Sequence, residues 1–167
     1  MTFTATYASP LGPLLLASED EALTGLWLAG QKYYAQGLGA DAVEDADAPV
    51  LRGAAEWLDA YFAGRRPEAV LKLAPKGSEF QRLVWSLLMD IPYGESTTYG
   101  ALAVRAETIL GRRTSARAIG AAVGCNPISI IVPCHRVLGA DGSLTGYAGG
   151  LEKKAWLLRH EEAQKTL

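Results

Sequence analysis

Residues 67–77 divide the chain into two halves whose hydrophobic patterns differ. The segment begins with proline and ends in Ala-Pro-Lys-Gly, a composition that interrupts helices and strands and is typical of a linker. Before it lie short β-prone runs and one helical pattern, and beyond it apolar residues recur mostly at the spacing of helices. We therefore predict two domains, residues 1–73 and 78–167, and a mixed α/β (α+β) fold class.

The first half has the pattern of a small α/β domain. Short β-prone runs bounded by turn residues predict strands over 3–7, 14–17 and 23–28. Pro49 is a first-turn proline that opens a helix, and Gly64 ends this helix. The Gly- and Asp-rich residues 31–48 between the strands and the helix predict a surface loop.

The second half is predicted to be mainly helical. Ser78 and Gln81 form a capping box at the start of one helix, which the Ile-Pro-Tyr-Gly run at 91–94 stops. Further helices are predicted over 99–106, from a cap at Thr114 or Ser115 to about 123, and over 151–162. The first two of these are short and are joined by an arginine-containing turn, which indicates a helix-turn-helix motif. Strand and turn residues fill the stretch from 126 to 150.

The formal net charge of −2 hides an asymmetry between the two halves. Residues 1–73 carry 5 Lys and Arg against 10 Asp and Glu, whereas residues 74–167 carry 11 against 8. Between positions 105 and 136 the only acid is Glu107, and the arginines are Arg105, Arg112, Arg113, Arg117 and Arg136. Contact with phosphates requires such a basic stripe, although a solvated surface explains the same charges equally well.

No segment indicates a membrane or an export route. No apolar run approaches the roughly 20 residues of a membrane span, and the first residues lack the pattern of a signal peptide. Cys125 and Cys134 are too few for a disulfide framework and predict a reducing, cytoplasmic setting. Together with His135 and His160 they offer no zinc-site spacing, so we expect neither a metal nor another cofactor.

The Ser-Ile-Ile-Val-Pro-Cys-His-Arg-Val run at 129–137 is the part of the chain most indicative of chemistry. It brings Cys134 to a position stiffened by proline, directly before His135 and an arginine. A thiol beside cationic groups has a lowered pKa and becomes a nucleophile, but a buried structural cysteine also explains this pattern. In an extended strand the two side chains point to opposite faces, so His135 reaches the sulfur only through a water or a turn.

Eight short blocks follow one another in the second half: Phe80-Gln81 with Val84-Trp85, Ile91-Pro92-Tyr93-Gly94-Glu95, Thr98-Tyr99-Gly100, Ala116-Arg117-Ala118-Ile119-Gly120, Asn126-Pro127, Ile131-Val132-Pro133-Cys134-His135-Arg136, Thr145-Gly146-Tyr147 with Gly149-Gly150-Leu151, and Trp156-Leu157-Leu158 with His160-Glu161. In this order they resemble the O6-alkylguanine-DNA alkyltransferase family, also called methylated-DNA–protein-cysteine methyltransferases. The likeness covers residues 78–162 and is looser over 1–73, where Ser9-Pro10-Leu11-Gly12 is the main match.

The resemblance implies a fold and a set of catalytic residues. The first domain is expected to be ribonuclease H-like, and the second to contain a winged helix-turn-helix-type motif that binds DNA. Cys134 is then the alkyl acceptor, and His135 is its base through a water. Glu161 orients His135, Asn126 braces the turn that carries the cysteine, and Tyr99 serves the flipped base.

The resemblance also implies how DNA and the substrate base are held. The helix around Arg117 enters the minor groove, Arg117 fills the gap in the base stack, and Tyr99 pushes the adjoining phosphate. Small residues of this helix, among them Ala118 and Ala121, let its backbone approach closely. The residues expected to line the base pocket are Tyr147, Ala148 and Val137.

One segment departs from the family pattern. Residues 105–114, between the two helices of the motif, are longer than usual by a few residues, which leaves open where the first helix ends. Arg112 and Arg113 in this segment are predicted to add phosphate contacts. The cysteine and histidine ligands that some family members use for a structural zinc in the first domain are absent from the sequence.

The activity implied is direct reversal of DNA damage. An alkyl group moves once and irreversibly from O6-alkylguanine, and from O4-alkylthymine, in double-stranded DNA to Cys134 after base flipping. The protein is expected to be a monomer, with cooperative binding to DNA left open. Three other interpretations remain: an alkyltransferase-like sensor that binds the lesion without transfer, a helix-turn-helix transcription factor, and a thiol hydrolase. The presence of Cys134 argues against the sensor.

Overall fold

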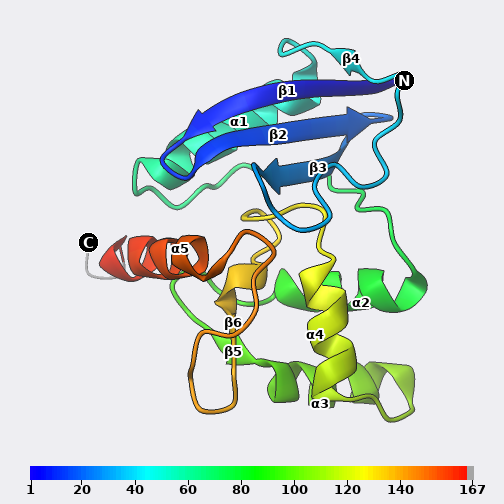
Figure 1. Cartoon of the computed structure of the whole chain (residues 1–167), viewed down its shortest axis with the longest axis vertical. Helices are drawn as coiled ribbons and strands as arrows, with labels where there is room; N and C mark the ends of the chain where they lie inside the picture. The colour runs from blue at the N-terminus through cyan, green and yellow to red at the C-terminus, as the bar shows by residue number, and fades with distance from the viewer. Residues whose placement is uncertain (165–167) are drawn as a thin grey trace. The chain divides into compact units, whose positions relative to one another are not determined.

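The computed structural model describes residues 1–164, which form two compact units (Figure 1). The first unit consists of Met1–Lys76 together with Pro127–Ser129, and the second of Gly77–Asn126 and the chain from Ile130 onward. Residues 127–129 therefore belong to the first unit, although the residues on both sides of them belong to the second.

The first unit is a four-stranded sheet with one helix packed on it (Figure 1). Its strands are β1 (Thr2–Ser9), β2 (Gly12–Glu19), β3 (Ala22–Leu28) and β4 (Val43–Glu44), in the order β3-β2-β1-β4. The first three are antiparallel neighbours, and β4 pairs in parallel with β1. Helix α1 (Pro49–Phe62) begins at its proline and buries Leu51, Leu58 and Tyr61, which removes their apolar surface from water.

The second unit contains the other helices. They are α2 (Glu79–Leu88), α3 (Tyr99–Leu110), α4 (Ala116–Gly124) and α5 (Leu151–Gln164), with a parallel pair of short strands, β5 (Thr97–Thr98) and β6 (Val137–Leu138). Helix α4 packs on α2 and α3, and the Trp85 indole N–H donates to the Ala122 carbonyl at 2.8 Å. The predicted mixed α/β fold with a helical second domain is confirmed. None of the helices in residues 1–164 combines the length and apolar character that a membrane span needs.

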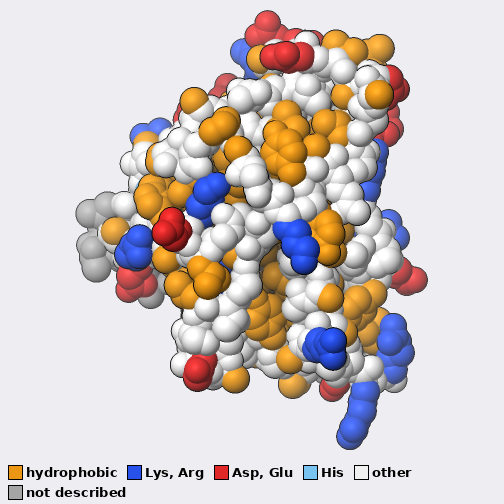
Figure 2. All heavy atoms as spheres, viewed as in Figure 1, with side chains coloured by type: hydrophobic (Ala, Val, Ile, Leu, Met, Phe, Trp, Pro, Cys, Tyr) orange, Lys and Arg blue, Asp and Glu red, His pale blue; other side chains and the backbone are white. Residues whose placement is uncertain are grey.

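The turn between α3 and α4 is shorter than the sequence predicts. Helix α3 does not end near Ala106 but continues to Leu110, where Gly111 adopts a left-handed φ of 69°. Ser115 then caps α4, its hydroxyl accepting from the Ala118 N–H. Most of the segment that departs from the family pattern is therefore helical. Several Lys and Arg side chains lie at this end of the second unit (Figure 2).

Candidate active site

The segment that carries Cys134 consists of two tight turns and is not the extended strand that its apolar sequence predicts. Pro133, with φ −81° and ψ 63°, is the centre of an inverse γ-turn in which the Cys134 N–H donates to the Val132 carbonyl at 2.8 Å. Cys134–Arg136 then form one turn of 3-10 helix. Of the two alternatives that the sequence left open, a water or a turn, the structure has a turn at this position.

Asn126 contacts this turn from the loop before it. Its side chain is buried, and Nδ2 donates to the Val132 carbonyl at 2.9 Å. The same side chain also hydrogen-bonds to Cys134. The Asn126 amide is thus hydrogen-bonded both to the backbone before the cysteine and to the cysteine itself.

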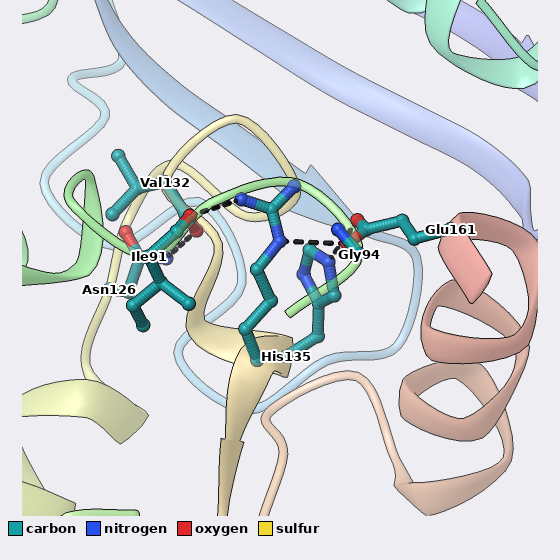
Figure 3. A network of polar contacts seen from close by, with 7 residues as sticks. Ile91, Gly94, Asn126, Val132, His135 and Glu161 are labelled. Carbon is teal, nitrogen blue, oxygen red and sulfur yellow. Dashed lines mark hydrogen bonds and ion pairs between the residues drawn. The ribbon is translucent and has the colours of Figure 1, made fainter. Parts of the chain in front are cut away.

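His135, Arg136 and Glu161 form a buried polar network beside the turn (Figure 3). Glu161 projects from α5, and its Oε2 lies 2.6 Å from His135 Nε2. Its Oε1 accepts from Arg136 Nε at 2.7 Å and from the Gly94 N–H at 3.3 Å. Arg136 Nη1 in turn donates to the Ile91 carbonyl at 2.7 Å. The carboxylate therefore links α5 to the 3-10 helix and to the loop after α2.

The charge states in this network follow from its contacts. Burial by itself raises the pKa of Glu161, but the hydrogen bonds and charges of His135 and Arg136 outweigh burial and hold that pKa well below its ordinary value. Burial lowers the pKa of His135, and Glu161 opposes this only in part. Glu161 is therefore ionised, and His135 is neutral with its proton on Nε2, the nitrogen that faces the carboxylate. Nδ1 is then an acceptor, and no group in residues 1–164 hydrogen-bonds to it.

This network predicts that the protein loses stability in acid. In the unfolded chain His135 takes up a proton near pH 6.5 and Glu161 near pH 4.3, whereas both pKa values are lower in the folded protein. Below each unfolded pKa the unfolded state binds more protons, so the free energy of unfolding falls as the pH decreases. Urea titrations between about pH 8 and about pH 4 should show a falling midpoint. A midpoint that stays constant over this range would contradict these charge states.

The Cys134 thiol is protonated at neutral pH. Cys134 is 5% exposed, and burial raises the pKa of its thiol to about 11, although the Asn126 hydrogen bond and the charge of Lys154 both lower it. The expected lowering of this pKa by cationic neighbours is therefore wrong for the protein without DNA. Polar and cationic neighbours are present, but burial outweighs them. Reaction of this sulfur as a nucleophile requires a base that removes its proton.

Lys154 is a member of the site that the sequence did not reveal. It lies on the same helix as Glu161, is fully buried, and places its ammonium on three carbonyls. These belong to Val137 at 2.5 Å, Thr145 at 3.0 Å and Gly146 at 3.0 Å. Burial lowers the pKa of Lys154 to about 8, so the group is mainly cationic at neutral pH. Lys154 therefore holds the loop after β6 and places a positive charge near the thiol.

Tyr99 opens α3 and contacts the same loop. Its hydroxyl donates to the Thr145 carbonyl at 2.9 Å, and its ring centroid lies 5.9 Å from the Lys154 ammonium. Burial raises the pKa of Tyr99, a hydrogen bond with the Thr145 side chain opposes this, and the charge of Cys134 adds to the rise, so the group is a phenol at neutral pH. A Cβ added at Gly120 of α4 would lie 3.7 Å from the Tyr99 ring. Tyr99 therefore lies between the loop and α4.

The residues predicted to line a base pocket have different environments. Tyr147 and Ala148 are half-buried in the loop after β6. Val137 is fully buried in β6, with its carbonyl bound to Lys154. Through Lys154 and Tyr99 this loop is connected to the surroundings of Cys134.

The exposed face of α4 carries small side chains and one arginine. Arg117 and Ala121 are exposed and Ala118 is half-buried, while the opposite face is buried through Ile119 and Val123. This face therefore permits close approach by another surface.

Two of the five arginines in the predicted basic stripe have partners within the protein. Arg136 is 8% exposed and holds Glu161, and Arg105 pairs with Asp90 at 3.0 Å. The other three arginines of the stripe, Arg112, Arg113 and Arg117, are exposed. The stripe is therefore confined to the turn before α4 and to α4 itself.

Two family models together match nearly the whole chain. Residues 2–75 match the ribonuclease-like domain of 6-O-methylguanine DNA methyltransferase, and residues 79–163 match the DNA-binding domain of the same family.

Relatives match over almost their full length. The methylated-DNA–protein-cysteine methyltransferase of Mycolicibacterium paratuberculosis is 48% identical over 166 residues, covering 97% of this chain and 96% of the relative. That of Methanosarcina barkeri is 47% identical over 155 residues, covering 92% and 93%. The crystal structure of Mycobacterium tuberculosis OGT in complex with DNA matches with 42% identity and a TM-score of 0.84, covering 97% of this chain and 94% of that one. The chain therefore belongs to the methylated-DNA–protein-cysteine methyltransferase family, enzymes of DNA repair that have a DNA-binding domain.

Proposed function

We propose that this protein repairs O6-alkylguanine in double-stranded DNA by moving the alkyl group onto Cys134. The observation that carries the proposal is the arrangement around the thiol. A buried cysteine that is hydrogen-bonded to Asn126 is followed by a neutral histidine. The Nδ1 atom of this histidine makes no hydrogen bond with any group in residues 1–164. Membership of the family supports a protein cysteine as acceptor. O4-alkylthymine, which carries the same alkyl–oxygen bond, is the expected second substrate.

In the proposed reaction His135 acts as the base. The Cys134 proton moves to His135 Nδ1, directly or through a water, and the ionised Glu161 stabilises the imidazolium that forms. The thiolate sulfur then attacks the carbon attached to O6. A carbon–sulfur bond forms as the carbon–oxygen bond breaks, and the electron pair stays on the guanine, which takes up a proton. We assign to the Tyr99 hydroxyl the hydrogen bond that assists this departure.

The proposed reaction requires the damaged base to leave the double helix. Inside a stacked pair the thiolate cannot reach the alkyl carbon in line, and extrusion costs a few kcal/mol. The small exposed side chains of α4 suit close approach to a narrow groove. Arg117 on the same face is proposed to occupy the position that the base vacates.

The proposed reaction consumes the protein, because water does not hydrolyse the thioether that forms. Mixing the protein with excess O6-methylguanine duplex should add one methyl group per chain, detected by intact mass and located on Cys134 by peptide mapping. Repair of many lesions per chain, as by a hydrolase that regenerates its thiol, would reject the proposal. Lesion binding without a gain in mass would select the sensor instead.

Arg112 and Arg113 are proposed to contact DNA phosphates. Replacing both with alanine should weaken binding to damaged and undamaged duplexes alike, because phosphate contacts carry no sequence information. The slope of log affinity against log salt should become shallower by roughly 2, the loss of two contacts. The matched control is the double variant Arg65→Ala/Arg66→Ala, an exposed pair in the first unit. Equal affinity and slope in the two double variants would contradict this role.

Lys154 is proposed to support both the loop and the thiolate. Lys154→Met should slow transfer by about tenfold, because the positive charge that lowers the thiol pKa is lost. The carbonyls that lose their donor should reduce the free energy of unfolding by about 2–4 kcal/mol. Single-turnover rates and urea midpoints measure the two effects. Lys153→Met, at the adjacent position of α5, is the control, and a Lys154→Met rate equal to that of the control would exclude this role.

A further inference from the structure

Residues 127–129 pair with the edge of the sheet in the first unit. The Leu26 N–H donates to the Pro127 carbonyl at 2.8 Å, and the Ser129 N–H donates to the Leu26 carbonyl at 3.0 Å. Leu26 of β3 and Ile128 therefore form a parallel bridge. Since β3 is an edge strand of the four-stranded sheet, this segment adds one parallel bridge to that edge.

Gln31 adds a side-chain clamp to this backbone pairing. It is 6% exposed, and its Oε1 accepts from the Leu28 N–H at 2.7 Å and from the Ser129 hydroxyl at 3.3 Å. Its Nε2 donates to the Lys32 carbonyl at 3.3 Å. One buried amide thus joins the end of β3 to Ser129. Because hydrogen bonds are directional, this contact fixes the position of Ser129 more narrowly than apolar packing alone would.

The residue after Ser129 carries backbone strain. Ile130 is fully buried and β-branched, yet its φ is 72°, a left-handed conformation that such residues rarely adopt. Strained conformations persist where the surrounding contacts over-determine them, and they are concentrated at functional sites. Ile130 directly follows Ser129, which Gln31 holds. Val132, two residues after Ile130, is held by the Asn126 side chain through its carbonyl. The short segment is therefore held at both ends.

We propose that Gln31 is a positioning residue for alkyl transfer, which acts through Ser129 on the turn that delivers Cys134. The inference rests on the proposed transfer to Cys134. Only four residues separate Ser129 from Cys134, and among them Ile130 has a left-handed φ and Pro133 is the centre of a tight turn. We therefore expect a displacement of Ser129 to move the Cys134 sulfur as well, because the short segment between them cannot absorb it. An in-line reaction is sensitive to such shifts, since a displacement of about 1 Å can cost on the order of 100-fold in rate.

A double-mutant cycle on the transfer rate tests the inference. Gln31→Met keeps the size of the side chain but removes its hydrogen bonds, and Ser129→Ala removes the hydroxyl. Each should lower the single-turnover rate constant at saturating O6-methylguanine duplex by about tenfold, with the Kd for the duplex changed less than about twofold. The double variant should be no slower than the slower single variant, because both changes break the same bond.

Destabilisation is separated from mispositioning by the amplitude of the reaction. A variant that is partly unfolded alkylates fewer chains but leaves the rate constant of the folded chains unchanged. Ser9→Ala is the matched control, since it removes a first-unit hydroxyl that bonds the Gly12 carbonyl at 2.6 Å. Its rate constant should equal that of the wild type.

Two results would overturn the inference while the wild type still gains a methyl group. They are unchanged rate constants in Gln31→Met and Ser129→Ala, and effects that simply add in the double variant. A wild type that gains no methyl group would instead remove the proposed function itself.

Discussion

Replacing Cys134 with serine will abolish methyl transfer and leave binding to lesion-containing duplex intact. A hydroxyl is much harder to ionise than a thiol, and burial has already raised the pKa of this thiol to about 11. The neutral His135 cannot supply an alkoxide at a useful concentration, so the rate should fall by a factor on the order of 10⁴ or more. Intact mass after incubation measures the transfer, and a duplex-binding titration measures the retained affinity.

The other cysteine provides the control for this change. Cys125→Ser removes a half-buried thiol that precedes Asn126 and should transfer methyl groups at the rate of the wild type. A Cys134→Ser protein that still strips lesions from duplex DNA would contradict the assignment of the acceptor. A methyl group found on Cys125 of the wild type would contradict it as well.

Glu161→Gln should reduce both transfer and stability. The amide keeps the shape of the side chain but leaves the buried Arg136 without its counter-charge, which should cost about 3–5 kcal/mol of unfolding free energy. An amide NH₂ facing His135 Nε2 also favours the tautomer with its proton on Nδ1, which turns the proposed base into a donor. Transfer should therefore slow by about 10²–10⁴-fold, measured in single-turnover reactions under conditions where the variant is folded.

The neighbouring acid separates a local effect from a general one. Glu162 is exposed on α5, and Glu162→Gln should change the unfolding free energy by less than about 0.5 kcal/mol. It should also transfer at the wild-type rate. If Glu161→Gln retained the wild-type rate, Glu161 would have no part in orienting His135.

Helix starts were predictable because they depend on local chemistry. Ser78 and Gln81 form the predicted capping box, with both reciprocal hydrogen bonds present. Pro49 opens α1, and Ser115 caps α4, as their types indicate. Each of these signals involves a side chain and backbone groups within a few residues, so it is contained in the sequence itself.

Backbone held by distant contacts was not predictable in the same way. The Ile-Ile-Val run before Pro133 is β-prone, and β-branched residues favour strands where nothing else competes. Here the run forms turns, because Asn126 binds the Val132 carbonyl and residues 127–129 pair with β3. No pattern within the run indicates either contact.

The burial of cations was the other feature that the sequence did not disclose. The sequence places Arg136 in a basic stripe, whereas in the structure it is a buried partner of Glu161. Lys154 is absent from the predicted site. The signal that could have found it is spacing, because Lys154 lies three residues before Leu157 and seven before Glu161, on one face of α5. A lysine on the same helical face as two buried residues is unlike a solvent-facing one.

The protonated state of Cys134 also limits the reaction of this thiol with oxidants. Cysteine reacts with peroxide and other electrophiles as the thiolate, which is the attacking nucleophile. Oxidation beyond the sulfenic acid is irreversible. A buried thiol with a pKa of about 11 presents almost none of that form to the surroundings. The proposed reaction uses this sulfur only once. Because the thiol stays protonated, it is expected to remain unoxidised between synthesis of the protein and its encounter with a lesion.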